Sequence, residues 1–188
     1  AVGQLALAYN TASNNTAVGY QAGYTNTTGT NIAAFGYQAL YANSTNSNVA
    51  AFGWKALTAS TADYNSAFGA SALQTNTTGA SNSAFGQGAL YLNTTGSNNT
   101  AVGQSALFNN TTSAENTAVG YQALYSNTTV GQNVAVGFQA AQNATGGYST
   151  FVGYRAGINQ TSGDSNTYIG RYAVGFSATS TGSGNTAV

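Results

Sequence analysis

The chain has 188 residues, of which only three are Lys or Arg and three are Asp or Glu, and it contains no His, Cys, Met or Pro. A net charge of zero argues against nucleic acid or an anionic membrane surface as partner, because both are bound through dense Lys and Arg. Since the usual general bases, reactive thiols and metal ligands are missing as well, we expect no enzyme, no catalytic residues, no cofactor and no metal site.

The three carboxylates, Asp63, Glu115 and Asp164, lie about fifty residues apart. We interpret them as isolated surface charges and not as a catalytic pair. The apolar runs are only a few residues long, so no segment is expected to insert directly into a membrane.

One repeating unit fills residues 1–188. Its pattern is Asn-x-Ala, then Val, Phe or Ile, then Gly-x-x-Ala, followed by a polar stretch that often contains Asn-Thr-Thr-Gly. The repeat glycines recur every 16 or 17 residues, at Gly3, Gly19, Gly36, Gly53, Gly69, Gly86, Gly103, Gly120, Gly137, Gly153 and Gly170. Residues 1–188 are therefore predicted to be a single continuous repeat domain, a fragment of a longer array.

In chain order, each unit is expected to begin with a short strand and to end in a turn. The strand of the unit at Gly120 is predicted over residues 117–123, which are rich in Val, Tyr and Thr, and the Asn, Ser, Thr and Gly that follow favour turns. Earlier in the chain, the units at Gly36 and Gly53 carry an added Ala after a displaced Asn, which indicates a β-bulge. At the end, two extra residues between Ser177 and Gly184 indicate an insertion loop.

A period near 17 residues is too short for helical-hairpin repeats or propeller blades and is typical of one coil of a β-solenoid. We expect an all-β parallel β-roll of about eleven coils, with strands stacked about 4.8 Å apart in a rod roughly 50 Å long. The repeat Ala, the Val or Phe before each Gly, and the Leu are expected to fill a narrow interior. The repeat Gly is expected where the backbone bends.

The Asn that opens most units is expected to form a structural ladder, with its amide bonded to the neighbouring coil. The ladder residues are Asn15, Asn65, Asn82, Asn99, Asn116, Asn133 and Asn166, and Ser149 takes the place once.

Aromatic side chains recur directly after the repeat Gly and again four residues later. The first set is interpreted as interface or glycan-contact residues: Tyr20, Tyr37, Trp54, Tyr121, Phe138 and Tyr154. The second set comprises Tyr24, Tyr41, Tyr91, Phe108 and Tyr125. A thin coil buries little apolar surface relative to the backbone that it orders, so we expect further copies to cover these stripes in a homo-oligomer.

The recurring Asn-Thr-Ala-Val-Gly, as at Asn15, Asn99 and Asn116, resembles the YadA-like head repeat of trimeric autotransporter adhesins. It resembles even more closely the repeat stalks of bacterial and phage tail-fibre-domain proteins, where units similar to NTAVGYQALYSNTTG recur. The resemblance covers all 188 residues and implies a left-handed roll, three chains about one axis, and a place on a cell surface or virion. The period here is longer than in the head repeats. The family's membrane anchor, coiled-coil stalk and self-cleaving chaperone are not among these residues.

The leading hypothesis is a structural segment of an extracellular fibre or filament, similar to an adhesin head or a tail fibre, that associates with itself as a homotrimer or a head-to-tail filament. The alternative is a lectin-like surface whose Tyr and Trp54 side chains bind host or surface glycans. A minor hypothesis is ice binding by Thr pairs such as Thr77-Thr78, although adjacent strand residues point to opposite faces. Asn-x-Ser/Thr sequons are expected in exposed turns, at Asn26, Asn43, Asn76, Asn93, Asn110, Asn127 and Asn143.

Overall fold

A computed structural model describes residues 1–174 and 181–188. It confirms an all-β, parallel β-solenoid, with eleven strands in about ten turns. No helix, and therefore no helix able to cross a membrane, is present in the described ranges. The insertion loop predicted between Ser177 and Gly184 lies partly outside the described residues.

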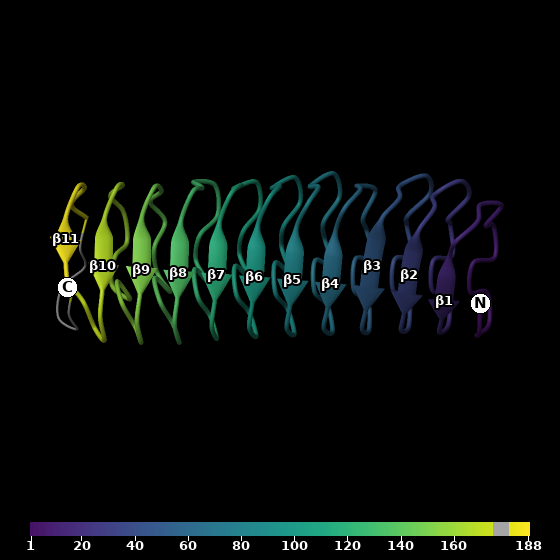
Figure 1. The fold of residues 1–188 in the computed structure, drawn as a ribbon, viewed down its shortest axis with the longest axis horizontal. Coiled ribbons are helices and arrows are strands. Elements are labelled where there is room, and N and C mark those ends of the chain that lie inside the picture. Colours follow the sequence, from purple (N-terminus) through teal and green to yellow (C-terminus); the bar gives the residue numbers. More distant parts are fainter. Residues whose placement is uncertain (175–180) are drawn as a thin grey trace.

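The strands succeed one another along the long axis of the rod in the order of the sequence, with the N-terminus at one end and the C-terminus at the other (Figure 1). They are β1 (Thr16–Val18), β2 (Ile32–Phe35), β3 (Val49–Phe52), β4 (Ser66–Phe68), β5 (Ser83–Phe85), β6 (Thr100–Val102), β7 (Thr117–Val119), β8 (Val134–Val136), β9 (Thr150–Val152), β10 (Thr167–Ile169) and β11 (Thr186–Ala187).

Neighbouring strands pair in register, so equivalent residues of successive coils lie directly above one another. Ala118 pairs with Ala135, and Val119 pairs with Val136. The same regular pairing holds between β2 and β3, so the predicted β-bulge is wrong. Ile32 and Val49 simply take the ladder position of Asn and are buried there.

Each strand is shorter than predicted, because the chain turns at the repeat glycine. β7 ends at Val119, and Gly120 has a φ of 135°. A Cβ at this position would collide with the carbonyl oxygen of Gly137 in the next coil. The glycine is therefore required twice, once for its φ and once for the close stacking of coils.

Two tight turns then bring the chain back. Ala123 N–H donates to the Gly120 carbonyl at 3.3 Å, and Asn127 N–H donates to the Leu124 carbonyl at 3.2 Å. Gln122 and Leu124 both have φ close to +50°, a left-handed conformation that is unusual for residues with a Cβ. Every coil repeats this path, which explains the constant period.

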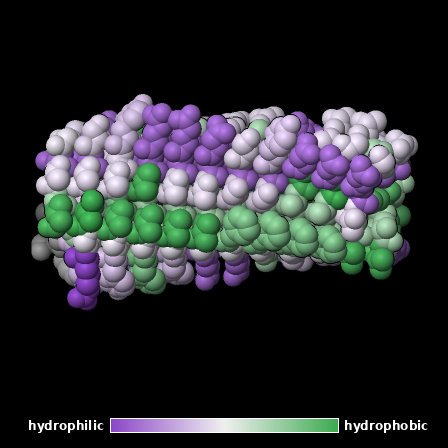
Figure 2. Space-filling model, viewed as in Figure 1, coloured by the Kyte–Doolittle hydropathy of each residue, from purple (hydrophilic) through white to green (hydrophobic). Residues whose placement is uncertain are grey.

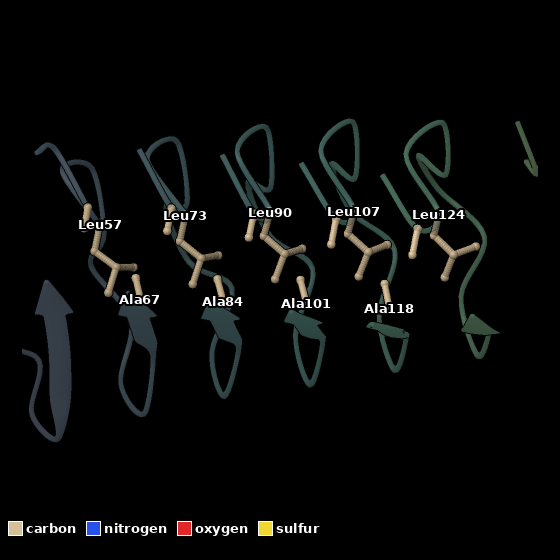
Figure 3. Packing of buried hydrophobic residues seen from close by; sticks show 14 of the residues in the cluster. Leu57, Ala67, Leu73, Ala84, Leu90, Ala101, Leu107, Ala118 and Leu124 are labelled. Atoms are coloured by element: carbon tan, nitrogen blue, oxygen red, sulfur yellow. The ribbon is translucent and has the colours of Figure 1, made fainter. Parts of the chain in front are cut away.

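The core consists of small side chains stacked from coil to coil, with one Leu in most coils. The central Ala of each strand from β1 to β8, the Ala three residues after the repeat Gly, and the Leu that follows it are fully buried in the middle coils. Figure 3 shows four successive Leu each lying over the strand Ala of the next coil, from Leu57 over Ala67 to Leu107 over Ala118. The prediction that Val and Phe before the Gly also fill the interior is wrong, since those side chains alternate with the buried Ala and point outward.

Two coils near the C-terminal end fill the same interior differently. Phe151 and Tyr168 replace the strand Ala and are 1% exposed. The space comes from the turn, where Ala141 and Gly157 stand in place of Leu. A Cβ at Gly157 would collide with the Phe151 ring, so the large ring and the missing side chain are matched.

Candidate interaction surface

The last residue of each strand from β1 to β10, together with Val2 before them, forms an unbroken apolar stripe along the rod. We define the apolar stripe by its members Val2, Val18, Phe35, Phe52, Phe68, Phe85, Val102, Val119, Val136, Val152 and Ile169. Figure 2 shows it as a continuous hydrophobic band across one face of the molecule. Most of its side chains are exposed, as at Val102 (37%) and Phe85 (41%), and Phe35, Phe52, Phe68 and Val119 are half-buried.

The phenylalanines of the stripe form a regular stack. The rings of Phe35, Phe52, Phe68 and Phe85 lie 4.6–4.9 Å apart, nearly parallel to one another. This spacing follows from the pairing of the strands, because in-register coils place equal side chains one above another. From β6 to β10 the stripe continues with Val and Ile.

The six aromatic residues predicted as interface or glycan contacts all lie on the surface, directly after the repeat Gly. Their exposure ranges from 37% at Tyr121 to 51% at Trp54. They form two groups, because Ala70, Gln87 and Gln104 take the equivalent positions between them. The structure therefore brings Tyr20, Tyr37 and Trp54 together near one end of the rod, and Tyr121, Phe138 and Tyr154 nearer the other.

Five of these six rings stack on a neighbour. Tyr20 and Tyr37 lie 5.4 Å apart with a 13° angle between their planes, and Phe138 stacks on Tyr121 at 5.1 Å and on Tyr154 at 5.3 Å. A sugar ring stacks on the face of an aromatic ring. Because a neighbouring ring already lies against each of the five stacked rings, the geometry at those five favours packing over glycan recognition.

All three cationic side chains lie against aromatic rings. The Lys55 ammonium lies 4.8 Å from the Trp54 ring centre, and the guanidinium of Arg171 lies 4.9 Å from that of Tyr172. Arg155 lies 5.4 Å from the Tyr154 ring and donates from Nε to Gln139 at 2.7 Å. These cations lie along the ring faces, so they add packing to the aromatic groups as well as charge.

The carboxylates bind neighbouring coils and do not converge. Asp63 accepts a hydrogen bond from the Ser47 N–H at 2.7 Å, and Asp164 accepts one from the Gly147 N–H at 2.8 Å. Glu115 accepts a hydrogen bond from the Gln132 side chain. In the part of the chain that the structure describes, no three His, Cys, Asp or Glu side chains gather where a metal ion could bind.

The predicted Asn ladder residues bond from coil to coil. The side-chain oxygen of Asn99 accepts the backbone N–H of Asn116 at 3.0 Å, and that of Asn116 accepts the N–H of Asn133 at 3.1 Å. The amide group of Asn99 also donates to the Ser113 carbonyl at 3.0 Å. The ladder is buried from Asn65 to Asn133, so its role here is to satisfy backbone groups inside the coil.

A second Asn ladder, which the sequence analysis missed, runs beside the first, and the two share acceptors, since Asn82 and Asn93 both donate to the Gly96 carbonyl. Asn93 donates to the side-chain oxygen of Asn76 at 2.7 Å, and Asn110 donates to that of Asn93 at 2.7 Å. The signal was present in the recurrence of Asn at the start of each Asn-Thr-Thr turn.

This second ladder contains most of the sequons, so the expectation that all seven lie exposed is wrong. Their side chains are fully buried at Asn26, Asn43, Asn76, Asn93, Asn110 and Asn127. Asn143 alone among the seven is exposed. In the folded chain, six of these amides therefore have no free surface to which a glycan could be attached.

In the Thr pairs beside this ladder, the hydroxyl of the first Thr donates to a backbone carbonyl of the next coil. Thr77 donates from its hydroxyl to the Thr94 carbonyl at 2.9 Å, and Thr94 donates to the Thr111 carbonyl at 3.0 Å. The second Thr of each pair is exposed. The turn thus presents one free rank of hydroxyls and not two, which weakens the ice-binding hypothesis.

Comparison with known proteins finds no matching family model, no matching curated protein and no matching solved structure.

Proposed function

We propose that this chain is a rigid structural segment of an extracellular fibre or filament, and that copies of it associate side by side through the apolar stripe. The observation that carries the proposal is the continuity of the stripe from Val2 to Ile169, with every coil contributing one apolar side chain that is exposed or half-buried. Folded monomers rarely leave an unbroken apolar surface of this kind in water.

The repeating geometry favours such an association. Because every coil presents an equivalent side chain at the same place, a contact made by one coil is repeated by each of its neighbours. Small contributions then add up over the length of the rod, as in other solenoids. A homotrimer and a filament both satisfy this requirement.

The extracellular placement rests on the resemblance of the repeat to adhesin heads and tail-fibre stalks. The composition is compatible with it, since a surface rich in Asn, Thr, Ser and Gln, with only three cationic and three anionic side chains, offers little to nucleic acid and depends little on salt. No cofactor or catalytic group takes part in the proposed role.

Sedimentation equilibrium of the wild-type chain beside Phe68→Lys tests the proposal. Phe68 lies in the middle of the stripe, so a lysine there places a charge inside the proposed contact, where it would lose its hydration. We expect an oligomer for the wild type and a loss of at least tenfold in association for the variant. Tyr148→Lys is the matched control, because Tyr148 is exposed in a turn outside the stripe.

Two results would contradict this proposal. One is a wild-type chain that is monomeric at all accessible concentrations. The other is an unchanged oligomer in Phe68→Lys with its β-structure intact by circular dichroism.

Glycan binding is the second candidate, and Trp54 is the ring that favours it. It is half exposed, and indole is the largest stacking surface in the chain. A glycan array probed with the wild type and with Trp54→Ala separates this candidate from the fibre proposal, since binding that is lost on substitution would support it.

A further inference from the structure

The chain has an unusual set of side chains that oxidants can attack. It has no Cys and no Met, the residues that react first in most proteins, but it has 13 Tyr and one Trp. Disulfide formation is therefore excluded as a way to link coils covalently. The phenol rings become the main site of oxidative chemistry.

One pair of these phenols is already in contact. The hydroxyl oxygens of Tyr9 and Tyr24 lie 3.2 Å apart, and their ring centres lie 5.1 Å apart with a 75° angle between the planes. The two residues belong to successive coils, 15 positions apart in the sequence. Each ring carbon next to a hydroxyl is only two bonds from its oxygen, so these carbons are also near one another.

We propose that Tyr9 and Tyr24 form a site of oxidative coupling, at which a haem peroxidase with hydrogen peroxide joins the two rings as dityrosine. The peroxide takes one electron and one proton from each phenol and is reduced to two molecules of water. The two phenoxyl radicals combine through the carbons next to their oxygens. The hydrogens on those carbons then move to the oxygens, so the chain loses two hydrogen atoms in total and gains one carbon–carbon bond.

The hydrogen bond between the hydroxyls supports this assignment. A phenol loses an electron more readily when an acceptor lies beside its proton, and in this pair one hydroxyl donates to the other at 3.2 Å. The same bond raises the pKa of Tyr24 above its ordinary value, so this phenol holds its proton and reacts by coupled loss of an electron and a proton.

What favours Tyr9 and Tyr24 is the hydrogen bond between their hydroxyls together with an edge-to-face ring contact, a contact that Tyr154 and Tyr172 also make at 5.3 Å. Tyr20 and Tyr37 stack with nearly parallel planes, which keeps the ring carbons in separate layers. Tyr64 and Tyr148 project from turns, 62% and 61% exposed, and no aromatic ring of the described residues lies against them. Oxidation of such isolated rings leads to coupling between molecules and not within one.

The product would be a covalent link between the first two coils of the solenoid. Coil separation at this end of the rod then requires breaking a carbon–carbon bond. Since both residues belong to one chain, the inference does not depend on self-association or on the proposed fibre role.

Peroxidase treatment of dilute full-length chain, followed by isolation of the monomer and peptide mapping by mass spectrometry, tests this inference. We expect a peptide pair joined between Tyr9 and Tyr24, two hydrogen masses lighter than the sum of its parts. Tyr9→Phe and Tyr24→Phe should each abolish that pair. Tyr64→Phe and Tyr148→Phe, as matched controls, should leave its yield unchanged.

Chain unfolded in urea before oxidation provides the second control, since loss of the coil geometry should reduce the Tyr9–Tyr24 pair at least fivefold relative to the folded chain. The inference is overturned if folded monomer contains no such pair, or if the pair forms equally well in the unfolded chain. Because each Tyr→Phe variant loses only one hydroxyl, the variants are expected to fold normally.

Discussion

The repeat glycine determines how closely one coil can approach the next. At Gly120 the φ of 135° and the carbonyl oxygen of Gly137 together exclude any side chain. Gly88 differs, because its φ is 65° and the atoms nearest to an added Cβ belong to the Phe108 ring. Glutamine, lysine and serine occupy the equivalent position in other coils with a similar φ.

We therefore expect Gly120→Ala to lower the free energy of unfolding by about 3 kcal/mol, from backbone strain and the collision with the next coil. Gly88→Ala should lower it by about 1 kcal/mol, the cost of a left-handed conformation for alanine. Urea unfolding followed by circular dichroism measures both. Equal losses in the two variants would show that the stacking of glycine on glycine has no special role.

At the scale of the strand, the sequence predicted where the strands lie better than it predicted which face of each strand is buried. The 16–17-residue period was sufficient for a parallel solenoid, because few architectures repeat so quickly. It did not show which side of the strand faces inward. In Thr117-Ala118-Val119 both Ala and Val are apolar, and only the volume available inside the coil assigns the smaller one to the core.

The sequons show that the sequence does not reveal which turn residues are buried either. Asn-Thr-Thr-Gly has the composition of an exposed loop, yet the corner of the coil folds over the Asn side chain. Asn93 is buried because its amide group satisfies the Gly96 carbonyl at 2.9 Å as well as the neighbouring Asn. Such an arrangement depends on the stacked coils, so a single unit of sequence does not reveal it.

The exchange of volume at Phe151 leads to a prediction about the core. Ala118→Phe alone should destabilise the chain by about 3 kcal/mol, because the interior has no room for a ring. Adding Leu107→Ala and Leu124→Gly reproduces the surroundings of Phe151, with Ala141 and Gly157 at the matching places.

The triple variant should therefore lose less unfolding free energy than the three single variants lose in sum, by at least about 2 kcal/mol, as expected for residues in direct contact. Thermal unfolding of the single and triple variants measures this coupling. Strictly additive losses would contradict the account of matched volumes.

At the scale of the whole molecule, the scarcity of charge agrees with the architecture. In-register stacking places equivalent side chains about 4.8 Å apart, so a charge repeated in each coil would repel its neighbours along the entire rod. Uncharged amides and hydroxyls instead bond from coil to coil, as the two Asn ladders do. The surface that remains unexplained by a single chain is the apolar stripe.

Cryo-electron microscopy of the native particle, with the full-length chain, tests the central claim most directly. We predict straight rods in which strands follow one another at about 4.8 Å and in which the apolar stripes of adjacent chains, including Phe68 and Val119, are in contact. Isolated single-chain rods whose stripes face solvent would contradict the account.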